Sequence, residues 1–316
     1  MTPRVVSVAC WNVDLVTQVE RLPAPGETVF GDGFTTGPGG KGSNVAVGLA
    51  RLGARVSIVA RLGDDAHGRS ALPFWRAEGI DCMHASTAPG EPNAVASILV
   101  SPEGENMIAV FRGAGFRLGA AEVQAARPAF EQARWVTMPL EIQDEAIGAA
   151  LALARDCGCR TLLNPAPARA LPAEWLRGVD VLTPNALEAR QLCGLPVGAA
   201  AAPAELGARL LERGVGAVVL TCGAQGAWLF EPGQAPLPLP PFAVQPVDTV
   251  GAGDAFNAGL AMALAEGATL AQAGRFASAT AALATTRRGA ALAMPRRTDV
   301  DEFLTKTTTT SEETAR

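Results

Sequence analysis

A glycine-rich segment near the C-terminus places an acid beside unpaired backbone amides. Residues 248–259 read Asp-Thr-Val-Gly-Ala-Gly-Asp-Ala-Phe-Asn-Ala-Gly and continue into an apolar stretch that ends near residue 265. Gly251, Ala252 and Gly253 would begin this helix, where N–H groups lack intrahelical partners and the helix dipole attracts anions. Asp254 follows in the first turn and could be a simple capping acid. An acid beside an anion hole is also what phosphoryl transfer requires: amides hold the phosphoryl charge and the carboxylate takes a hydroxyl proton.

A second glycine-rich segment, residues 37–44, reads Gly-Pro-Gly-Gly-Lys-Gly-Ser-Asn before a helical stretch. It matches G-x-G-x-x-G, but a dinucleotide fingerprint should follow the first strand at once, and about 27 residues intervene here. A P-loop fails too, because Thr35 stands where its first glycine belongs and Gly42 follows the lysine. We therefore predict a loop that brings a ligand close to the backbone, with Lys41 and Asn44 as donors. The alternative is a flexible turn.

Polar residues follow four successive strand-like runs. They are Glu141, Asn164, Asn185 and Thr221, and Glu188 lies one helical turn after Asn185. Each alone could be a cap or a turn residue. Ligands of open parallel sheets bind outside the carboxyl ends of the strands, so four such residues at one edge predict a binding site.

The elements that would position these residues alternate between strand and helix. Strands are expected at 5–9, 56–60, 135–138, 161–163, 179–182 and 218–220, and helices at 45–52, 70–78, 144–156, 186–193 and 203–213. This alternation predicts a parallel sheet covered on both faces. Residues 13–34 and 94–116 break it with Gly, Pro and β-forming residues, and are expected to be hairpins that can pair as a small second sheet. Residues 305–316 are expected to be a disordered tail.

Composition excludes several classes. The chain has 316 residues, of which 48% are hydrophobic and 18% charged, so it can bury a large core. Its net charge of −5 argues against nucleic acid as its main binding partner. No apolar run is long enough to span a membrane, and the N-terminus does not resemble a signal peptide. Six scattered cysteines suggest reduced thiols in a cytoplasmic protein. With only His67 and His84, a histidine metal cluster is not expected.

Together these motifs resemble the phosphofructokinase-B (ribokinase-like) family of sugar kinases, from about residue 5 to 304. The matching segments are residues 12–14, 25–28, 39–44, 63–65, 104–106, 164–168, 183–185 and 248–254. The resemblance implies a ribokinase-like three-layer α/β/α fold with a mostly parallel central sheet. It also implies one kinase domain, 1–304, in which the two inserted segments form a small β-sheet lid that closes over the sugar and contributes a homodimer contact.

The resemblance implies ATP-dependent transfer of the γ-phosphoryl group to a primary hydroxyl of a sugar, D-ribose giving ribose 5-phosphate. Alternatives within the family are another pentose, deoxyribose, a ketohexose or a nucleoside. Two other classes stay open: a nicotinamide-dependent oxidoreductase, based on residues 37–42, and a catalytically silent sugar sensor. The implied cofactors are ATP, Mg²⁺ and a monovalent cation, K⁺.

Roles carry over where residues match the family. Asp254 is implied to be the catalytic base, with Gly251, Ala252 and Gly253 as its anion hole. The implied sugar-binding residues are Asn12, Asp14, Gly40, Lys41, Asn44, Glu141 and Asp254. The implied nucleotide contacts are Asn185, Glu188, Thr221, Gly223, Gly226, Gly253 and Ser278, with Glu188 tied to magnesium and phosphate placement. The implied monovalent-cation site comprises Asp248 with Val250, Ala284, Arg287 and Gly289.

The chain departs from the family pattern at several positions. Ser278 replaces a frequent histidine near adenine, and Ala293 replaces a polar residue near the cation site. Trp11 is bulky beside Asn12, while Asn93 and residues 111–115 differ where the lid meets the sugar.

Overall fold

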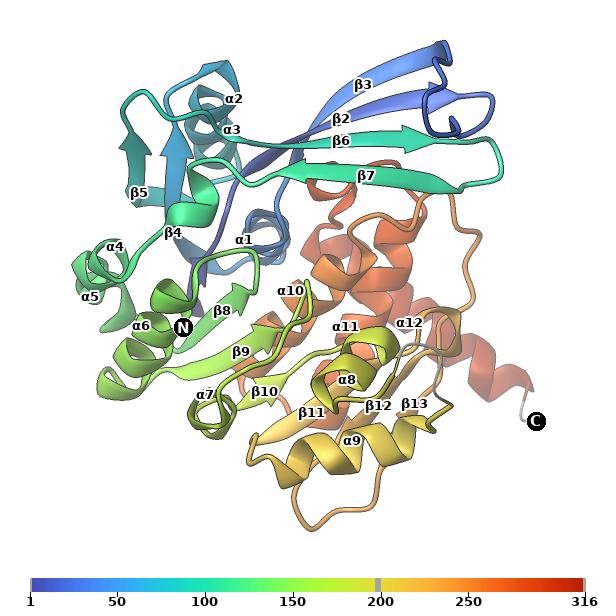
Figure 1. Cartoon of the computed structure of the whole chain (residues 1–316). Helices are drawn as coiled ribbons and strands as arrows, with labels where there is room; N and C mark the ends of the chain where they lie inside the picture. Colours follow the sequence, from blue (N-terminus) through green and yellow to red (C-terminus); the bar gives the residue numbers. More distant parts are fainter. Residues whose placement is uncertain (1, 197–199, 315–316) are drawn as a thin grey trace.

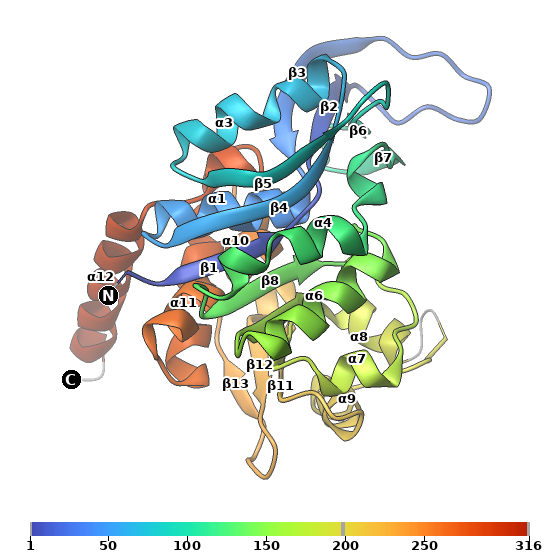
Figure 2. The same ribbon diagram turned by 90° about the vertical axis from the view of Figure 1, so that its left-hand side faces the viewer.

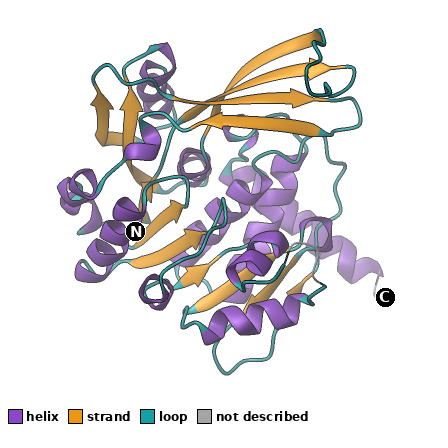
Figure 3. Cartoon of the chain, viewed as in Figure 1, coloured by secondary structure: helices purple, strands orange, loops and turns teal. Residues whose placement is uncertain are grey.

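The computed structural model describes residues 2–196 and 200–314. Within them, nine strands form a large sheet, in the order β13-β12-β11-β10-β9-β8-β1-β4-β5, and four form a smaller one, in the order β3-β2-β6-β7 (Figures 1 and 3). The large sheet contains β1 (Arg4–Val8), β4 (Arg55–Gly63), β5 (Asp81–Ala88), β8 (Trp135–Pro139), β9 (Arg160–Asn164), β10 (Val181–Leu182), β11 (Ala217–Thr221), β12 (Ala227–Phe230) and β13 (Leu237–Leu239). The small sheet contains β2 (Asn12–Val19), β3 (Gly31–Gly39), β6 (Ala94–Val100) and β7 (Asn106–Phe111).

The large sheet is parallel from β5 to β11, and only β12 and β13 are antiparallel to their neighbours. Both faces of this sheet are buried. Successive side chains of a strand point to opposite faces, and both sets pack into a core. In β11, Val219 packs into the core on one face, whereas Val218 and Leu220 pack into the core on the other. This explains the nearly continuous apolar strands in the sequence and confirms the predicted two-sided parallel sheet.

Two layers of helices cover the sheet (Figure 2). One contains α1 (Lys41–Arg51), α3 (Ala71–Ala77), α10 (Ala252–Glu266), α11 (Leu270–Thr285) and α12 (Arg297–Thr314). The other contains α4 (Ala120–Ala125), α5 (Arg127–Phe130), α6 (Asp144–Asp156), α7 (Ala173–Arg177), α8 (Ala186–Leu192) and α9 (Pro203–Glu212). Helix α10 packs against α1 and α11, and every residue from Asp254 to Ala265 is buried. Short helices are α2 (Ala66–Arg69), η1 (Gly115–Arg117), η2 (Gly223–Gln225) and η3 (Ala291–Ala293).

The two segments that interrupt the alternation do form one small sheet, as the sequence predicted. Each is an antiparallel pair, β2 with β3 and β6 with β7, and the pairs join through the parallel contact of β2 with β6 that begins at Asn12 and Ala94. Figure 1 shows this sheet above the ends toward which β8 and β9 point. We call these four strands the lid sheet. Strand β3 extends beyond the expected limit at residue 34 and ends at Gly39, directly before α1.

The segment from residue 305, expected to be disordered, continues α12 as far as Thr314, and residues 315 and 316 lie outside the described residues. The helix is anchored before that point, because Val300 is buried in the core and Phe303 packs against Phe242. Once a helix is nucleated, each further residue adds a hydrogen bond, so the helix extends through the threonines. No described helix is both long enough and apolar enough to cross a membrane.

Candidate active site

The first turn of α10 contains the predicted anion hole and acid. Gly251 is the N-cap residue and has a φ of +75°, and a Cβ there would lie 2.8 Å from the Ala290 Cα. Glycine is therefore required both by the left-handed backbone and by close packing. A Cβ at Gly253 would meet nothing within 4 Å, and Gly251 and Gly253 both line a cavity. This geometry suits an anion at the helix N-terminus.

Asp254 is buried at 5% exposure, and its Oδ2 accepts a 2.8 Å hydrogen bond from Asn44 Nδ2. Burial raises the pKa of Asp254, while Lys41 and the Asn44 bond oppose that shift. In turn, Asp254 raises the pKa of the Lys41 ammonium. A carboxylate with a raised pKa is a stronger base than a free aspartate, and the nearby ammonium favours its ionised form.

The loop before α1 brings a second carboxylate to the site. Gly40 has a φ of +94°, and a Cβ there would collide with the Cys10 carbonyl oxygen. This tight turn aims the Lys41 backbone N–H at Glu141, which accepts it at 2.7 Å through Oε2. Burial raises the pKa of Glu141 to about 7, despite the opposing effect of Lys41. The predicted glycine-rich loop and the predicted strand-end acid thus meet.

The N-terminal end of the lid sheet supplies another polar pair. Asn12 Nδ2 donates a 2.8 Å hydrogen bond to Asp14 Oδ1 on β2. A Cβ at Gly39 would collide with the Asp14 carboxyl, so glycine leaves the room that this side chain occupies. Burial raises the pKa of Asp14 to about 6, with a smaller contribution from Asp254. Asn12 and Asp14, with Asn44 and Glu141, offer amide donors and carboxylate acceptors, the combination that suits the hydroxyls of a polyol.

Three of the four predicted strand-end residues, Asn164, Asn185 and Thr221, line one cavity of about 240 Å³ together with Glu188, whereas Glu141 does not line it. It is lined by Lys41, Asn164, Ala166, Thr183, Asn185, Glu188, Thr221, Thr249, Gly251, Gly253, Asp254 and Asn257. The cavity therefore joins the ends of three parallel strands to the first turn of α10 and the buried Asp254. Lys41 contributes to both sides of the site: its backbone N–H donates to Glu141, and its ammonium interacts electrostatically with Asp254 and Glu188, which line this cavity.

Asn185 and Glu188 also cap a helix. Glu188 N donates to Asn185 Oδ1 and Asn185 N donates to Glu188 Oε2, both at 2.8 Å, which forms a capping box at the start of α8. Both residues therefore have the structural role of a helix cap, and both line the cavity as well. Burial raises the pKa of Glu188.

Three predicted nucleotide contacts do not line that cavity. Gly223 is exposed in η2, and Gly226 closes the same turn by accepting a 2.8 Å hydrogen bond from Cys222 N. Ser278 lies on α11, where its hydroxyl donates to the Gly274 carbonyl at 2.9 Å. Their role in nucleotide binding stays a prediction.

The residues of the predicted cation site lie together next to the first turn of α10. Asp248 accepts hydrogen bonds from Val250 N at 3.0 Å and from Gly289 N at 2.8 Å. Its own N–H donates to the Thr285 carbonyl, next to Ala284, and Arg287 N donates to the Ala284 carbonyl at 3.2 Å. Asp248 thus ties the turn before α10 to the turn after α11. Among the described residues, no cluster of three His, Cys, Asp or Glu side chains forms a metal site.

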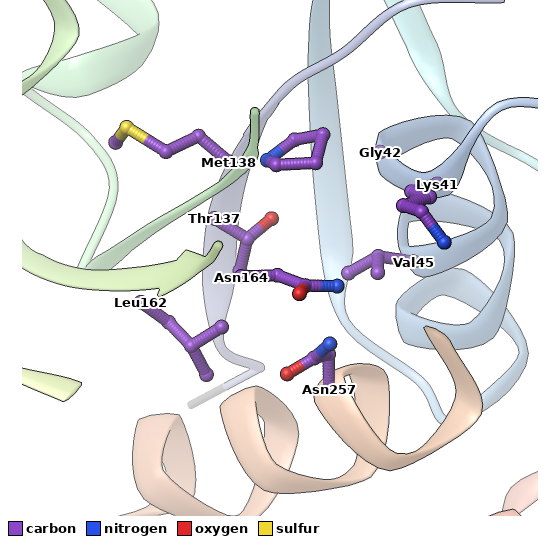
Figure 4. Close-up of a pocket in the computed structure, with 9 residues that line it drawn as sticks. Lys41, Gly42, Val45, Thr137, Met138, Leu162, Asn164 and Asn257 are labelled. Atoms are coloured by element: carbon purple, nitrogen blue, oxygen red, sulfur yellow. The ribbon is translucent and has the colours of Figure 1, made fainter. Parts of the chain in front are cut away.

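A smaller cavity, of about 10 Å³, lies next to the larger one and shares Lys41, Asn164 and Asn257 with it (Figure 4). Two buried oxygens near it, Thr137 Oγ1 and Asn257 Oδ1, have no protein hydrogen-bond partner. Neither residue was predicted from the sequence to belong to the site. Asn257 could have been found, because it lies three residues after Asp254 and therefore on the same face of α10.

Known proteins resemble this chain over most of its length. The family profile "pfkB family carbohydrate kinase" matches residues 2–297. Ribokinase of Bacillus subtilis is 37% identical over 93% of this chain and 96% of its own, and ribokinase of Haemophilus influenzae is 35% identical over 93% and 95%. The solved structure of Arabidopsis thaliana ribokinase complexed with ribose and ATP superimposes with a TM-score of 0.85 at 30% identity, over 96% of this chain and 99% of that one.

Proposed function

Because the chain belongs to the pfkB family of carbohydrate kinases, we propose that it phosphorylates D-ribose with ATP to give ribose 5-phosphate and ADP. The observation that carries this proposal is the buried Asp254 in the first turn of α10, between the polyol-binding residues and the cavity at the strand ends. A hydroxyl held there faces a base on one side and a phosphoryl-binding helix terminus on the other. The similarity to ribokinases and the ribose and ATP in the Arabidopsis structure support the choice of substrates.

In the proposed reaction, the 5-hydroxyl oxygen of ribose attacks the γ-phosphorus of ATP, and the bond from that phosphorus to the β–γ bridging oxygen breaks. Asp254 accepts the hydroxyl proton. The N–H groups of Gly251, Ala252 and Gly253 stabilise the charge on the transferring phosphoryl oxygens, as the partial positive charge of a helix N-terminus does. The Lys41 side chain adds a full positive charge on the same side of the site.

We assign the sugar to Asn12, Asp14, Gly40, Asn44 and Glu141 and the nucleotide to the cavity side that contains Asn185, Glu188 and Thr221. A Mg²⁺ ion accompanying ATP would be held mainly by its phosphates, with Glu188 as the nearby protein carboxylate. When bound, the ion neutralises phosphate charge. Glu188 suits this role because it is partly buried, faces the cavity and keeps lone pairs beyond the one engaged by Asn185 N.

The test of the substrate is a coupled ADP-release assay with ATP across D-ribose, deoxyribose, other pentoses, ketohexoses and nucleosides. We expect the highest kcat/KM with D-ribose. A higher kcat/KM with another member of the panel would replace ribose while leaving the kinase assignment intact. Tight NAD(H) binding without any ATP turnover would overturn the kinase proposal as a whole.

We also propose a monovalent-cation site that comprises Asp248 and the backbone carbonyls near Val250, Ala284, Arg287 and Gly289. Its support is that Asp248 links the turn before the anion hole to Gly289, so a cation there would stabilise the anion hole electrostatically. Since Ala293 offers no side-chain oxygen, the apparent K⁺ affinity should be weaker than in Ala293→Ser. The measurement is turnover against K⁺ concentration at constant ionic strength. Turnover that is indifferent to K⁺ in both proteins would leave Asp248 a purely structural role.

The lid sheet supports a further proposal, a homodimer. Its edge strand β7 is exposed along its whole length, and Met107, Ile108, Val110 and Phe111 are each at least half exposed. An unpaired apolar edge favours pairing with a second copy. Light scattering after size-exclusion chromatography should give the dimer mass for the wild type and the monomer mass for Ile108→Lys. A monomeric wild type at micromolar concentration would contradict the proposal.

A further inference from the structure

Three of the connections between the large sheet and the lid sheet meet at one place beside the end of β4 (Figure 1). Trp11 precedes β2, Asn93 precedes β6, and Gly113 follows β7. A Cβ at Gly63, the last residue of β4, would collide with the Asn93 backbone N, and a Cβ at Gly113 would collide with the Ala94 N. We call these four residues, Trp11, Gly63, Asn93 and Gly113, the lid joint. Its backbones are in contact, so the position of one lid strand constrains the others.

Asn93 connects the parts of the lid joint through its side-chain amide and its backbone N–H. Its Nδ2 donates to the carbonyls of Trp11 at 3.2 Å and of Ala94 at 2.9 Å, and its Oδ1 accepts from Gly63 N at 3.1 Å. Its backbone N donates to Asp65 Oδ2 at 3.0 Å. The residue is 1% exposed, so water does not replace these bonds. Only an amide side chain supplies two donors and an acceptor in this geometry.

The core side of the lid joint is fixed firmly. Asp65 accepts from Gly68 N at 2.8 Å and so caps α2, and Trp11 Nε1 donates to the His67 carbonyl at 3.0 Å. The Trp11 ring packs against Phe74 at 5.6 Å and edge-on against Trp75 at 5.4 Å between centroids. The bulky Trp11, unusual beside Asn12, is therefore an anchor for the start of β2.

We propose that Asn93 is a positioning residue for the sugar site. Its amide holds the Trp11 and Ala94 carbonyls, which lie directly at the start of the β2–β6 ladder, where Asn12 pairs with Ala94. It thereby fixes where Asn12 and, two residues on, Asp14 lie relative to Gly40 and Glu141. This inference rests on the proposed function, in which Asn12 and Asp14 bind the sugar. Since Asn93 touches neither the anion hole nor the strand-end cavity, its effect falls on sugar binding.

The experiment compares Asn93→Ala with wild type and with Ser97→Ala, a control on β6, the strand that follows Asn93, whose side chain is exposed. Losing the buried amide should raise the ribose KM about tenfold or more, whereas kcat and the ATP KM should change less than about twofold. Calorimetric titration with ribose in the absence of ATP should show the same weakening. Thermal melting confirms that the variant is folded, and Asn93→Thr, which keeps one donor and one acceptor, should give an intermediate KM.

Hydrogen exchange of the ligand-free proteins separates this inference from the proposed function. In Asn93→Ala, the amides of β2 and β6 should exchange at least several-fold faster than in wild type, while those of β1 and β8 are unchanged. This readout does not depend on which sugar is the substrate. Two results would overturn the positioning role. One is that the amides of β2 and β6 exchange at the same rate in Asn93→Ala and in wild type. The other is that Asn93→Ala lowers kcat and leaves the sugar KM unchanged.

Discussion

Replacing Glu141 by glutamine should change how stability depends on pH. Burial raises the pKa of Glu141 from its ordinary value of 4.5 to about 7, so between these values the folded protein binds more protons than the unfolded chain. The free energy of unfolding therefore falls as pH rises. For one such group, linkage gives a loss of about 2 kcal/mol between pH 5.5 and 8. Glu141→Gln removes the titration and still offers an acceptor for Lys41 N.

The assay is urea unfolding of the ligand-free protein at pH 5.5 and pH 8, followed by tryptophan fluorescence. The stability of Glu141→Gln relative to wild type should rise by about 2 kcal/mol between the two pH values, and its sugar KM should increase because a neutral amide is a weaker acceptor for hydroxyls. Glu131→Gln, an exposed glutamate, is the control and should show no such change. Parallel stability curves for Glu141→Gln and wild type would refute the buried, proton-binding Glu141.

Two further predictions concern the first turn of α10. Asp254→Asn should lower kcat by about 10²–10⁴-fold, the usual cost of losing a general base, with a smaller effect on sugar affinity; retention of most of the turnover would exclude Asp254 as the base. Gly251→Ala should cost at least about 1–2 kcal/mol of unfolding free energy, because of its left-handed backbone and the close Ala290. An added Cβ at Gly253 has open space, so Gly253→Ala should have the same melting temperature as wild type, and a fall in its kcat would report on the phosphoryl site alone. Equal melting temperatures for Gly251→Ala and Gly253→Ala would contradict the strain at Gly251.

The alternation of strands and helices was predictable because each buried strand is a short apolar run. The lid sheet was predictable for the opposite reason, since its segments break that alternation with turns and β-forming residues. The sequence pattern did not indicate β5, whose residues are mixed, or β12 and β13, which are only four and three residues long. It also did not indicate that α12 would continue through its threonines, because that helix depends on the tertiary contact between Phe303 and Phe242.

Within the site, local motifs were predictable and their mutual contacts were not. The spacing of Gly251, Gly253 and Asp254 predicts an anion hole beside an acid, since these residues are neighbours in the chain. The bonds from Lys41 N to Glu141 and from Asn44 to Asp254 join residues far apart in sequence. The same is true of Asn93, which looked like one departure among several until its amide was seen between Trp11 and Gly63.

The position of β1 near the middle of the large sheet has a consequence for synthesis on the ribosome. Val5 pairs with Val56 on one side and with Trp135 on the other. Nascent chains emerge at about 5–20 residues per second, so roughly ten seconds pass between the synthesis of β4 and that of β8. During that time the edge of β1 that will pair with β8 has no partner. We infer that the nascent chain exposes this edge until β8 emerges, and that chaperone contact or misfolding during translation would begin there.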